Sequence, residues 1–144
     1  MWRTVWASAL VAVVWTGTAR AEGAIAVGLP SDDPKNGFVY GIVTDKATVE
    51  DARSGAMSEC KGVDVRDTSR AKQACKIIET FRNQCANAAY NGDRNTVSTA
   101  VGWGVGPDTA TANSRAMAMC NTVRKGTGRP CQLDGDPVCD GDAK

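Results

Sequence analysis

Cysteine is the residue type in this sequence whose number and spacing point most directly to chemistry. The chain of 144 residues contains six cysteines, which are Cys60, Cys75, Cys85, Cys120, Cys131 and Cys139. No two of them form the C-x-x-C pair that zinc sites and thioredoxin-like redox sites use. An even number of cysteines without such a pair is typical of a disulfide framework in an oxidising compartment.

Histidine is absent from the chain. Its absence excludes the Ser-His-Asp and Cys-His nucleophile systems and every zinc site with a histidine ligand.

Ser69 and Lys72 have the S-x-x-K spacing of some serine enzymes, but neither the S-D-N nor the K-T-G motif accompanies them. We interpret that segment as a polar loop or strand start, and we expect no catalytic residue, no resident metal and no cofactor.

Two acidic motifs, Asp134-Gly-Asp136 and Asp140-Gly-Asp142, flank Cys139. Carboxylates around glycine turns are calcium-ligand chemistry, but the EF-hand pattern and its final Glu are missing. We therefore favour an acidic C-terminal segment exposed to solvent over a weak calcium site.

The glycine-rich run at residues 102–106 precedes a helix start, where phosphates can bind. It lacks the full dinucleotide spacing, and we interpret it as a glycine-rich turn.

The charges are nearly balanced, with 17 basic and 16 acidic residues. A near-neutral chain of this size is a poor nucleic-acid binder, because such binding depends on phosphate neutralisation. Basic residues are concentrated in one segment, but Asp64 and Asp67 lie among them and reduce its net positive charge. We therefore favour an exposed loop of mixed charge, and the alternative is a surface that binds an anionic partner. The basic residues of this segment are Lys61, Arg66, Arg70, Lys72, Lys76 and Arg82.

The first 21 residues have the organisation of an export signal. Arg3 precedes an uncharged apolar run at residues 5–15, and Ala19-Arg20-Ala21 has the A-x-A form of a signal-peptidase site. The apolar run is shorter than the roughly 20 residues that a transmembrane helix needs. We therefore predict a signal peptide at residues 1–21, a mature chain that starts at Glu22, no transmembrane segment, and a periplasmic or secreted protein.

The chain contains an internal repeat with a shift of sixty residues, which brings residues 48–60 over residues 108–120. Thr48 and Asp108 are both preferred N-cap residues. Small or apolar residues recur on one helical face of each copy. Each half is therefore predicted to carry a helix of about thirteen residues that ends in a cysteine. The matched residues are Ala52, Ser54, Ala56, Met57 and Cys60 in the first copy and Ala112, Ser114, Ala116, Met117 and Cys120 in the second.

Strand-like runs flank both predicted helices. They lie at residues 24–27, 38–43 and 75–81 in the first half, and at residues 86–90, 97–105 and after Cys131 in the second. We predict an α+β fold in which two strand-strand-helix-strand repeats, about 23–85 and 86–139, form one antiparallel sheet with two helices on one face. Residues 22–139 are then a single disulfide-stabilised domain, and residues 140–144 are a disordered tail.

Six cysteines allow fifteen connectivities. Pairing the two repeats alike, and joining each helix-end cysteine to the next one along the chain, gives Cys60–Cys75 and Cys120–Cys131. Cys85–Cys139 then remains to tie the repeats together.

Tyr40 and Trp103 lie on matching strands of the two halves. If the helices cover one sheet face, the other face stays open, and these aromatic side chains are candidates for a shared binding patch. The alternative is that Trp103 belongs to the core.

Several of these residues carry a resemblance to a known family. The start Gly23-Ala-Ile-Ala, the Ala-rich helix that ends in Cys, the strand Cys-Lys-Ile-Ile, and Phe81-Arg-Asn-Gln-Cys-Ala-Asn-Ala-Ala resemble a family of bacterial secreted domains. It is the domain-of-unknown-function family numbered four-one-eight-nine, and the likeness covers roughly residues 23 to 133. The resemblance implies export, cysteine pairing and a small α+β fold, and it supplies no catalytic residue to carry over.

These observations favour an exported, non-catalytic interaction module, monomeric or homodimeric, that binds another protein or an envelope component. The alternative is a secreted effector with an enzymatic activity that the sequence does not reveal. A purely structural envelope protein is a third hypothesis.

Overall fold

The structure is a computed structural model that describes residues 21–32, 34, 37–64, 69–92, 98–126 and 128–144. The predicted signal peptide therefore lies outside the described residues, except for Ala21. Within these ranges, no helix is long and apolar enough to cross a membrane.

The first half of the domain is an antiparallel three-stranded sheet in the order β2-β1-β3, and α1 packs on one of its faces. A short helix that the sequence analysis did not predict, α2, precedes β3. The elements are β1 (Glu22–Gly28), the 3-10 helix η1 (Pro30–Asp32), β2 (Val39–Lys46), α1 (Val49–Gly62), α2 (Ser69–Gln73) and β3 (Cys75–Phe81).

The second half repeats this topology. Its sheet has the order β5-β4-β6, and a further short strand, β7, also pairs with β4. The predicted strand-strand-helix-strand repeat is thus present twice, and both sheets place the first strand of the half in the middle. The elements are β4 (Cys85–Tyr90), β5 (Val101–Gly106), α3 (Thr109–Arg124), β6 (Gln132–Leu133) and β7 (Val138–Cys139).

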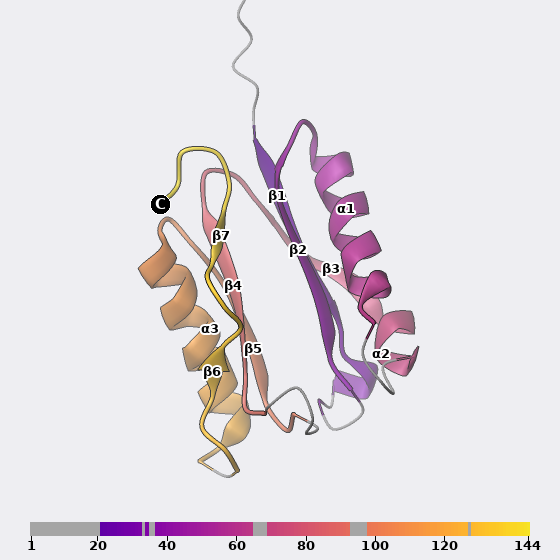
Figure 1. The fold of residues 1–144 in the computed structure, drawn as a ribbon, viewed down its shortest axis with the longest axis vertical. Helices are drawn as coiled ribbons and strands as arrows, with labels where there is room; N and C mark the ends of the chain where they lie inside the picture. The colour runs from indigo at the N-terminus through magenta and orange to yellow at the C-terminus, as the bar shows by residue number, and fades with distance from the viewer. Residues whose placement is uncertain (1–20, 33, 35–36, 65–68, 93–97, 127) are drawn as a thin grey trace, which may run out of the picture.

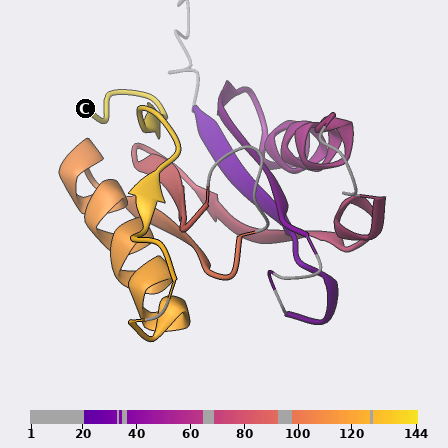
Figure 2. The same cartoon turned by 60° about the horizontal axis from the view of Figure 1, so that its bottom comes forward.

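The two halves do not form the single sheet that we predicted. They form two antiparallel sheets that face each other, with α1 and α3 on opposite outer sides (Figures 1 and 2). Strand β1 shows the reason, because both of its faces are apolar. Ala24 and Ala26 lie in the cluster under α1, whereas Ile25 and Val27 lie in the cluster between the sheets. A second apolar sheet face must also be removed from water, and the other sheet covers it.

Glycines let each helix approach its sheet closely. A Cβ atom on Gly41 would lie 2.4 Å from the carbonyl oxygen of Ala56 in α1, and one on Gly102 would lie 2.3 Å from that of Ala116 in α3. The run at residues 102–106 is therefore not the glycine-rich turn that we expected. It is strand β5, and the absence of side chains at Gly102 and Gly104 leaves room for the backbone of α3.

Both helices begin at the predicted caps. The Thr48 hydroxyl accepts a hydrogen bond from the Asp51 amide at 3.1 Å, and the Asp108 carboxylate accepts one from the Thr111 amide at 2.7 Å. The bond from the Thr111 amide, reinforced by the Thr111 side chain, lowers the pKa of Asp108 below its ordinary value. These caps satisfy amides that the first turn of a helix leaves without intrahelical partners.

The disulfides join Cys60 to Cys75, Cys85 to Cys139, and Cys120 to Cys131, the same pairs that the repeat comparison proposed. One detail differs, because Cys85 begins β4. The boundary between the halves therefore falls in the turn before Cys85, and the Cys85–Cys139 bond lies within the second sheet.

Candidate functional site: a buried carboxylate between the two halves

The two aromatic residues proposed as a binding patch lie between the sheets. Tyr40 on β2 and Trp103 on β5 both pack against the intersheet cluster, which contains Ile25, Phe81 and Val105. In the part of the chain that the structure describes, these strand faces point toward the other sheet and not toward open solvent, and both side chains are partly buried there. The structure thus gives Tyr40 and Trp103 a packing role.

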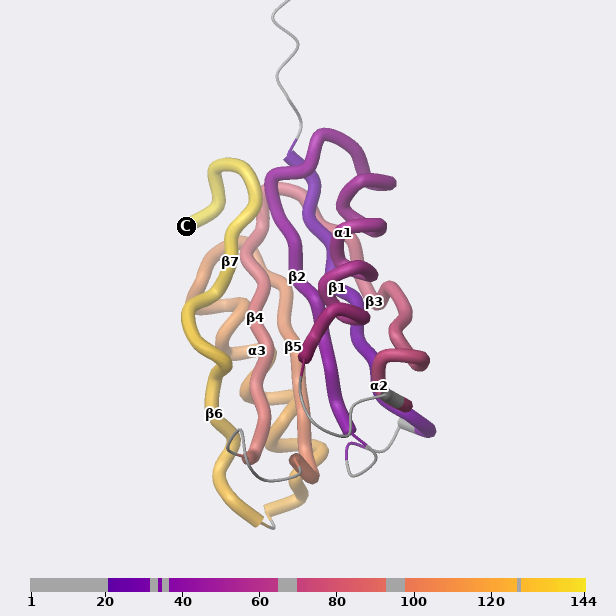
Figure 3. The backbone as a smooth tube through the Cα atoms, turned by 45° about the vertical axis from the view of Figure 1, so that its right-hand side comes forward, coloured from indigo at the N-terminus to yellow at the C-terminus, as the bar shows by residue number. Residues whose placement is uncertain are grey.

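One group of polar contacts that the fold creates involves the C-terminal strap, which we define as residues 132–144. The strap begins after Cys131, which a disulfide joins to Cys120 in α3. It pairs with β4 through β6 and β7 and runs beside β4 along the sheet (Figure 3). It also reaches the first half of the domain, since the Tyr40 hydroxyl on β2 donates a hydrogen bond to the carboxylate of Asp134.

Asp140 is the centre of this contact between the halves. Its side chain is completely buried, which corrects the expectation of a disordered tail after Cys139. One carboxylate oxygen accepts from the Asp45 amide at 2.9 Å, and the other accepts from the Asn83 amide at 3.0 Å. The Asp140 amide donates to the Gln84 carbonyl at 2.8 Å. A buried carboxylate is tolerated when hydrogen bonds of this kind compensate for its lost hydration.

The two donor amides are aimed at Asp140 by an uncommon backbone conformation. Asp45 has a φ of 57° and Asn83 a φ of 49°, so both are in the left-handed region. Asn and Asp tolerate this region better than most residues. Asp45 also accepts a hydrogen bond on its own side chain from the Gly141 amide at 3.0 Å. Asp45 therefore donates a hydrogen bond to Asp140 and accepts one from Gly141, so two hydrogen bonds join it to the strap.

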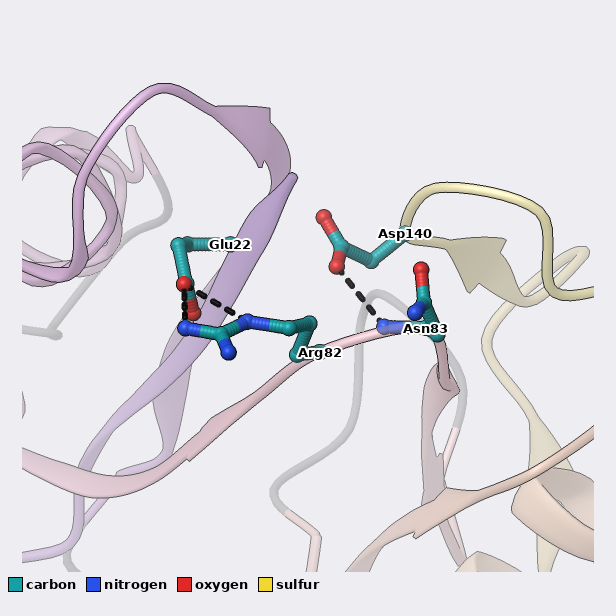
Figure 4. Close-up of polar contacts among 4 residues, drawn as sticks. All are labelled: Glu22, Arg82, Asn83 and Asp140. Atoms are coloured by element: carbon teal, nitrogen blue, oxygen red, sulfur yellow. Dashed lines mark hydrogen bonds and ion pairs between the residues drawn. The ribbon is translucent and has the colours of Figure 1, made fainter. Parts of the chain in front are cut away.

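A second charged contact lies beside this carboxylate. Glu22, the first residue of β1, is buried and accepts a hydrogen bond from Nε of Arg82 at 2.7 Å (Figure 4). A second nitrogen of the guanidinium also contacts the same oxygen. Arg82 and Asn83 are neighbours in the turn between β3 and β4, so this turn contacts both the start of β1 and the strap.

These contacts join the two halves of the domain, and we call them the junction; its residues are Glu22, Tyr40, Asp45, Arg82, Asn83, Asp134, Asp140 and Gly141. Both oxygens of Asp140 and one oxygen each of Glu22, Asp45 and Asp134 accept hydrogen bonds from the chain's own donors. In the part of the chain that the structure describes, no group of three His, Cys, Asp or Glu side chains is placed to hold a metal ion. The acidic motifs considered for calcium are thus drawn into protein contacts at Asp134 and Asp140.

The remaining candidates from the sequence are dispersed. Ser69 and Lys72 both belong to α2, whose Ala71 is buried in the cluster under α1. The basic cluster divides among several elements, with Lys61 at the end of α1 and Arg82 in its contact with Glu22. Arg66 lies outside the described residues.

Three residues of the junction were missed by the sequence analysis, namely Glu22, Asp45 and Asn83. They carry no motif, because the partners of Asp45 and Asn83 lie 95 and 57 residues away. The one available signal was residue type, since Asn and Asp near a strand end favour the left-handed turn that both adopt.

One of the comparisons with known proteins identifies a family for this chain. A family model described as "Domain of unknown function (DUF4189)" matches residues 23–136, which is most of the chain and nearly all of the described domain. No curated protein and no solved structure matches the chain at a significant level.

Proposed function

The chain belongs to the DUF4189 family, and for this member we propose the role of an exported, non-catalytic module that binds a protein or an envelope component. One observation carries this proposal. The groups in the chain with the greatest capacity for chemistry are used to hold the fold together. All six cysteines are in disulfides, and the buried carboxylates of Glu22 and Asp140 accept hydrogen bonds from Arg82 and from two backbone amides.

The disulfides also bear on where the module acts. Three disulfides in a domain of this size indicate an oxidising, extracytoplasmic environment. Together with the predicted signal peptide, they support a periplasmic or secreted location. We propose that the recognition surface lies on the outside of the domain, because Tyr40 and Trp103 pack between the sheets.

Affinity capture tests this function. The exported, oxidised protein is immobilised and exposed to the envelope fraction of its host, and any captured component is purified and titrated back. We expect saturable binding by the oxidised protein and none by a reduced and alkylated control. Purified protein that cleaved peptidoglycan, lipid or nucleotide, and lost this activity on replacement of one Asp or Glu, would instead support the effector alternative.

Two matched variants then locate the surface. Ser58 on α1 and Ala118 on α3 occupy equivalent positions of the repeat, and both are exposed. Replacing either by Arg adds bulk and charge to one outer face without entering the core. Loss of binding in one variant, with retention in the other, would assign the partner to the corresponding helix.

A further inference from the structure

We propose that the Cys85–Cys139 disulfide is a reducible clasp, which holds the end of the C-terminal strap in place and releases it when a dithiol reduces the bond. The proposal goes beyond the binding role and does not depend on it. It rests on the exposure of the cysteines and on what the bond secures.

Exposure distinguishes this bond from the other two. Cys60 and Cys120 are completely buried, and their partners Cys75 and Cys131 are 9% and 7% exposed. Both of these bonds lie in the apolar clusters beneath α1 and α3. Cys85 is also completely buried, but Cys139 is partly exposed. Because a thiolate must reach one sulfur of a disulfide to exchange with it, we expect the attack at Cys139, the partly exposed member of this pair.

The position of the bond also differs. Cys85 and Cys139 are directly opposite each other on neighbouring antiparallel strands, with their Cα atoms 3.9 Å apart. The other two bonds have Cα separations of 6.2 Å and 6.1 Å.

The exchange balances with a dithiol as the reductant. One thiolate of the dithiol attacks Sγ of Cys139, which forms a mixed disulfide and releases Cys85 as a thiolate that takes up a proton. The second thiol of the reductant then attacks the mixed disulfide and releases Cys139. Two electrons and two protons have passed to the protein, and the reductant leaves as its own disulfide.

Besides this bond, the end of the strap is held by a short strand and by hydrogen bonds, among them one from the Thr109 amide to the Lys144 carbonyl. Strand β7 has only two residues, and it is preceded by Pro137 and by Gly135 in a positive-φ conformation. Beyond β7, the strap is held by the contacts of Asp140 and Gly141 with Asp45 and the turn at Asn83. Reduction removes the covalent tie on residues 138–144 and leaves only these non-covalent contacts, while the Cys120–Cys131 bond continues to hold the chain just before β6. We expect the remaining contacts to open much more readily without the disulfide.

Opening the clasp has two structural consequences. The backbone of β4 at Cys85 and Ala86 loses β7 and keeps β5 as its partner strand, and the amides of Asp45 and Asn83 lose their acceptor. These positions belong to both halves of the domain. The redox state of one bond thus controls the contact between the halves at this end of the sheets.

Partial reduction tests the order of bond breaking. The oxidised protein is titrated with dithiothreitol, free thiols are trapped with iodoacetamide at intervals, and the modified cysteines are identified by peptide mapping. We expect Cys85 and Cys139 to be modified together and about tenfold faster than the other four cysteines. Earlier reduction of either other bond, or loss of all three bonds in one step, would overturn the proposal.

Hydrogen exchange tests the release. After selective reduction and alkylation, the amides of Asp45 and Asn83 should exchange about tenfold faster or more, while the amides of α1 and α3 keep their protection. The Cys85→Ser/Cys139→Ser variant should show the same pattern without reductant, and the reduced wild-type protein decides the question if this variant does not fold. If the amides of Asp45 and Asn83 exchanged no faster after selective reduction, the disulfide would not control the contact of the strap and the proposal would be wrong.

Discussion

Gly102 on β5 lies directly beneath Ala116 on α3, so close that a Cβ atom on the glycine would stand 2.3 Å from the alanine carbonyl oxygen. Gly41 and Ala56 have the same relationship in the first half, at 2.4 Å. The small residues of the two helices and the glycines of the two strands therefore form matched contact surfaces. This explains why alanine recurs on the buried face of each helix.

Gly102→Ala should destabilise the domain by about 2 kcal/mol or more, because the added methyl group forces helix and sheet apart. Gly62→Ala is the matched control, since nothing lies within 4 Å of a Cβ at this exposed helical position. It should leave the free energy of unfolding unchanged or raise it by up to about 1 kcal/mol, because alanine favours a helix over glycine. Urea unfolding of both variants gives the comparison, and equal effects would contradict close packing at Gly102.

Asp140→Ala should cost about 2–4 kcal/mol, because it leaves the amides of Asp45 and Asn83 without their acceptor. Asp142, two residues later, is exposed, and Asp142→Ala should change stability by no more than about 0.5 kcal/mol. Chemical denaturation with the disulfides intact measures both. A neutral Asp140→Ala variant would mean that the buried carboxylate does not hold the two halves together.

Trp103→Ala should destabilise the protein by about 3 kcal/mol, because it opens a cavity between the two sheets. Val123 on α3 is 39% exposed, and Val123→Ala should be nearly neutral. Thermal unfolding separates the two cases. If Trp103→Ala abolished partner binding at an unchanged thermal midpoint, Trp103 would be a contact residue and its packing role would be wrong.

The cap of α3 predicts a defined pH dependence. The pKa of Asp108 is lowered in the folded state from its ordinary 3.8, chiefly by the Thr111 amide. The ionised cap therefore stabilises the protein at pH values above the unfolded pKa, and this contribution is lost as the pH falls through the folded pKa. Asp108→Asn keeps an acceptor but does not titrate. The stability advantage of the wild type over this variant should be constant near pH 7 and shrink below about pH 4; an advantage that grew in acid would contradict the assignment.

The intact mass of the exported protein should correspond to a chain that starts at Glu22. The structure adds a reason why this residue matters, because Glu22 is buried at the start of β1 and paired with Arg82. Glu22→Gln should lower stability by about 1 kcal/mol, since an amide replaces the charged acceptor. A chain that retained Met1 after export would refute the predicted cleavage.

Local patterns in the sequence were enough to predict the repeat, the two long helices and their caps. Thr48 and Asp108 are N-cap residues that mark the helix starts, and the spacing of the alanines up to Cys60 and Cys120 indicates the buried faces. These features depend on residues within a few turns of one another. The repeat also supplied the disulfide pairs, since each helix-end cysteine has a nearby partner in sequence.

The arrangement of the sheets depended on a pattern that we misjudged. Ala24, Ile25, Ala26 and Val27 are all apolar, which is the mark of a strand buried on both faces. The single-sheet prediction left one of those faces open to solvent. The buried contacts of Asp140 could not be predicted from local sequence, because the amides of Asp45 and Asn83 that donate to its carboxylate lie 95 and 57 residues away in the chain.

The separation of the disulfides along the chain has a consequence for how an exported chain would mature. Cys60–Cys75 and Cys120–Cys131 close short loops, with separations of 15 and 11 residues, whereas Cys85–Cys139 spans 54. A polypeptide that leaves the cytoplasm from its N-terminus presents Cys60 and Cys75 first, and Cys85 follows ten residues later. Each local pair can therefore be oxidised as it emerges, and Cys85 waits for the final segment. The order of emergence thus discourages mispairing without a requirement for disulfide reshuffling.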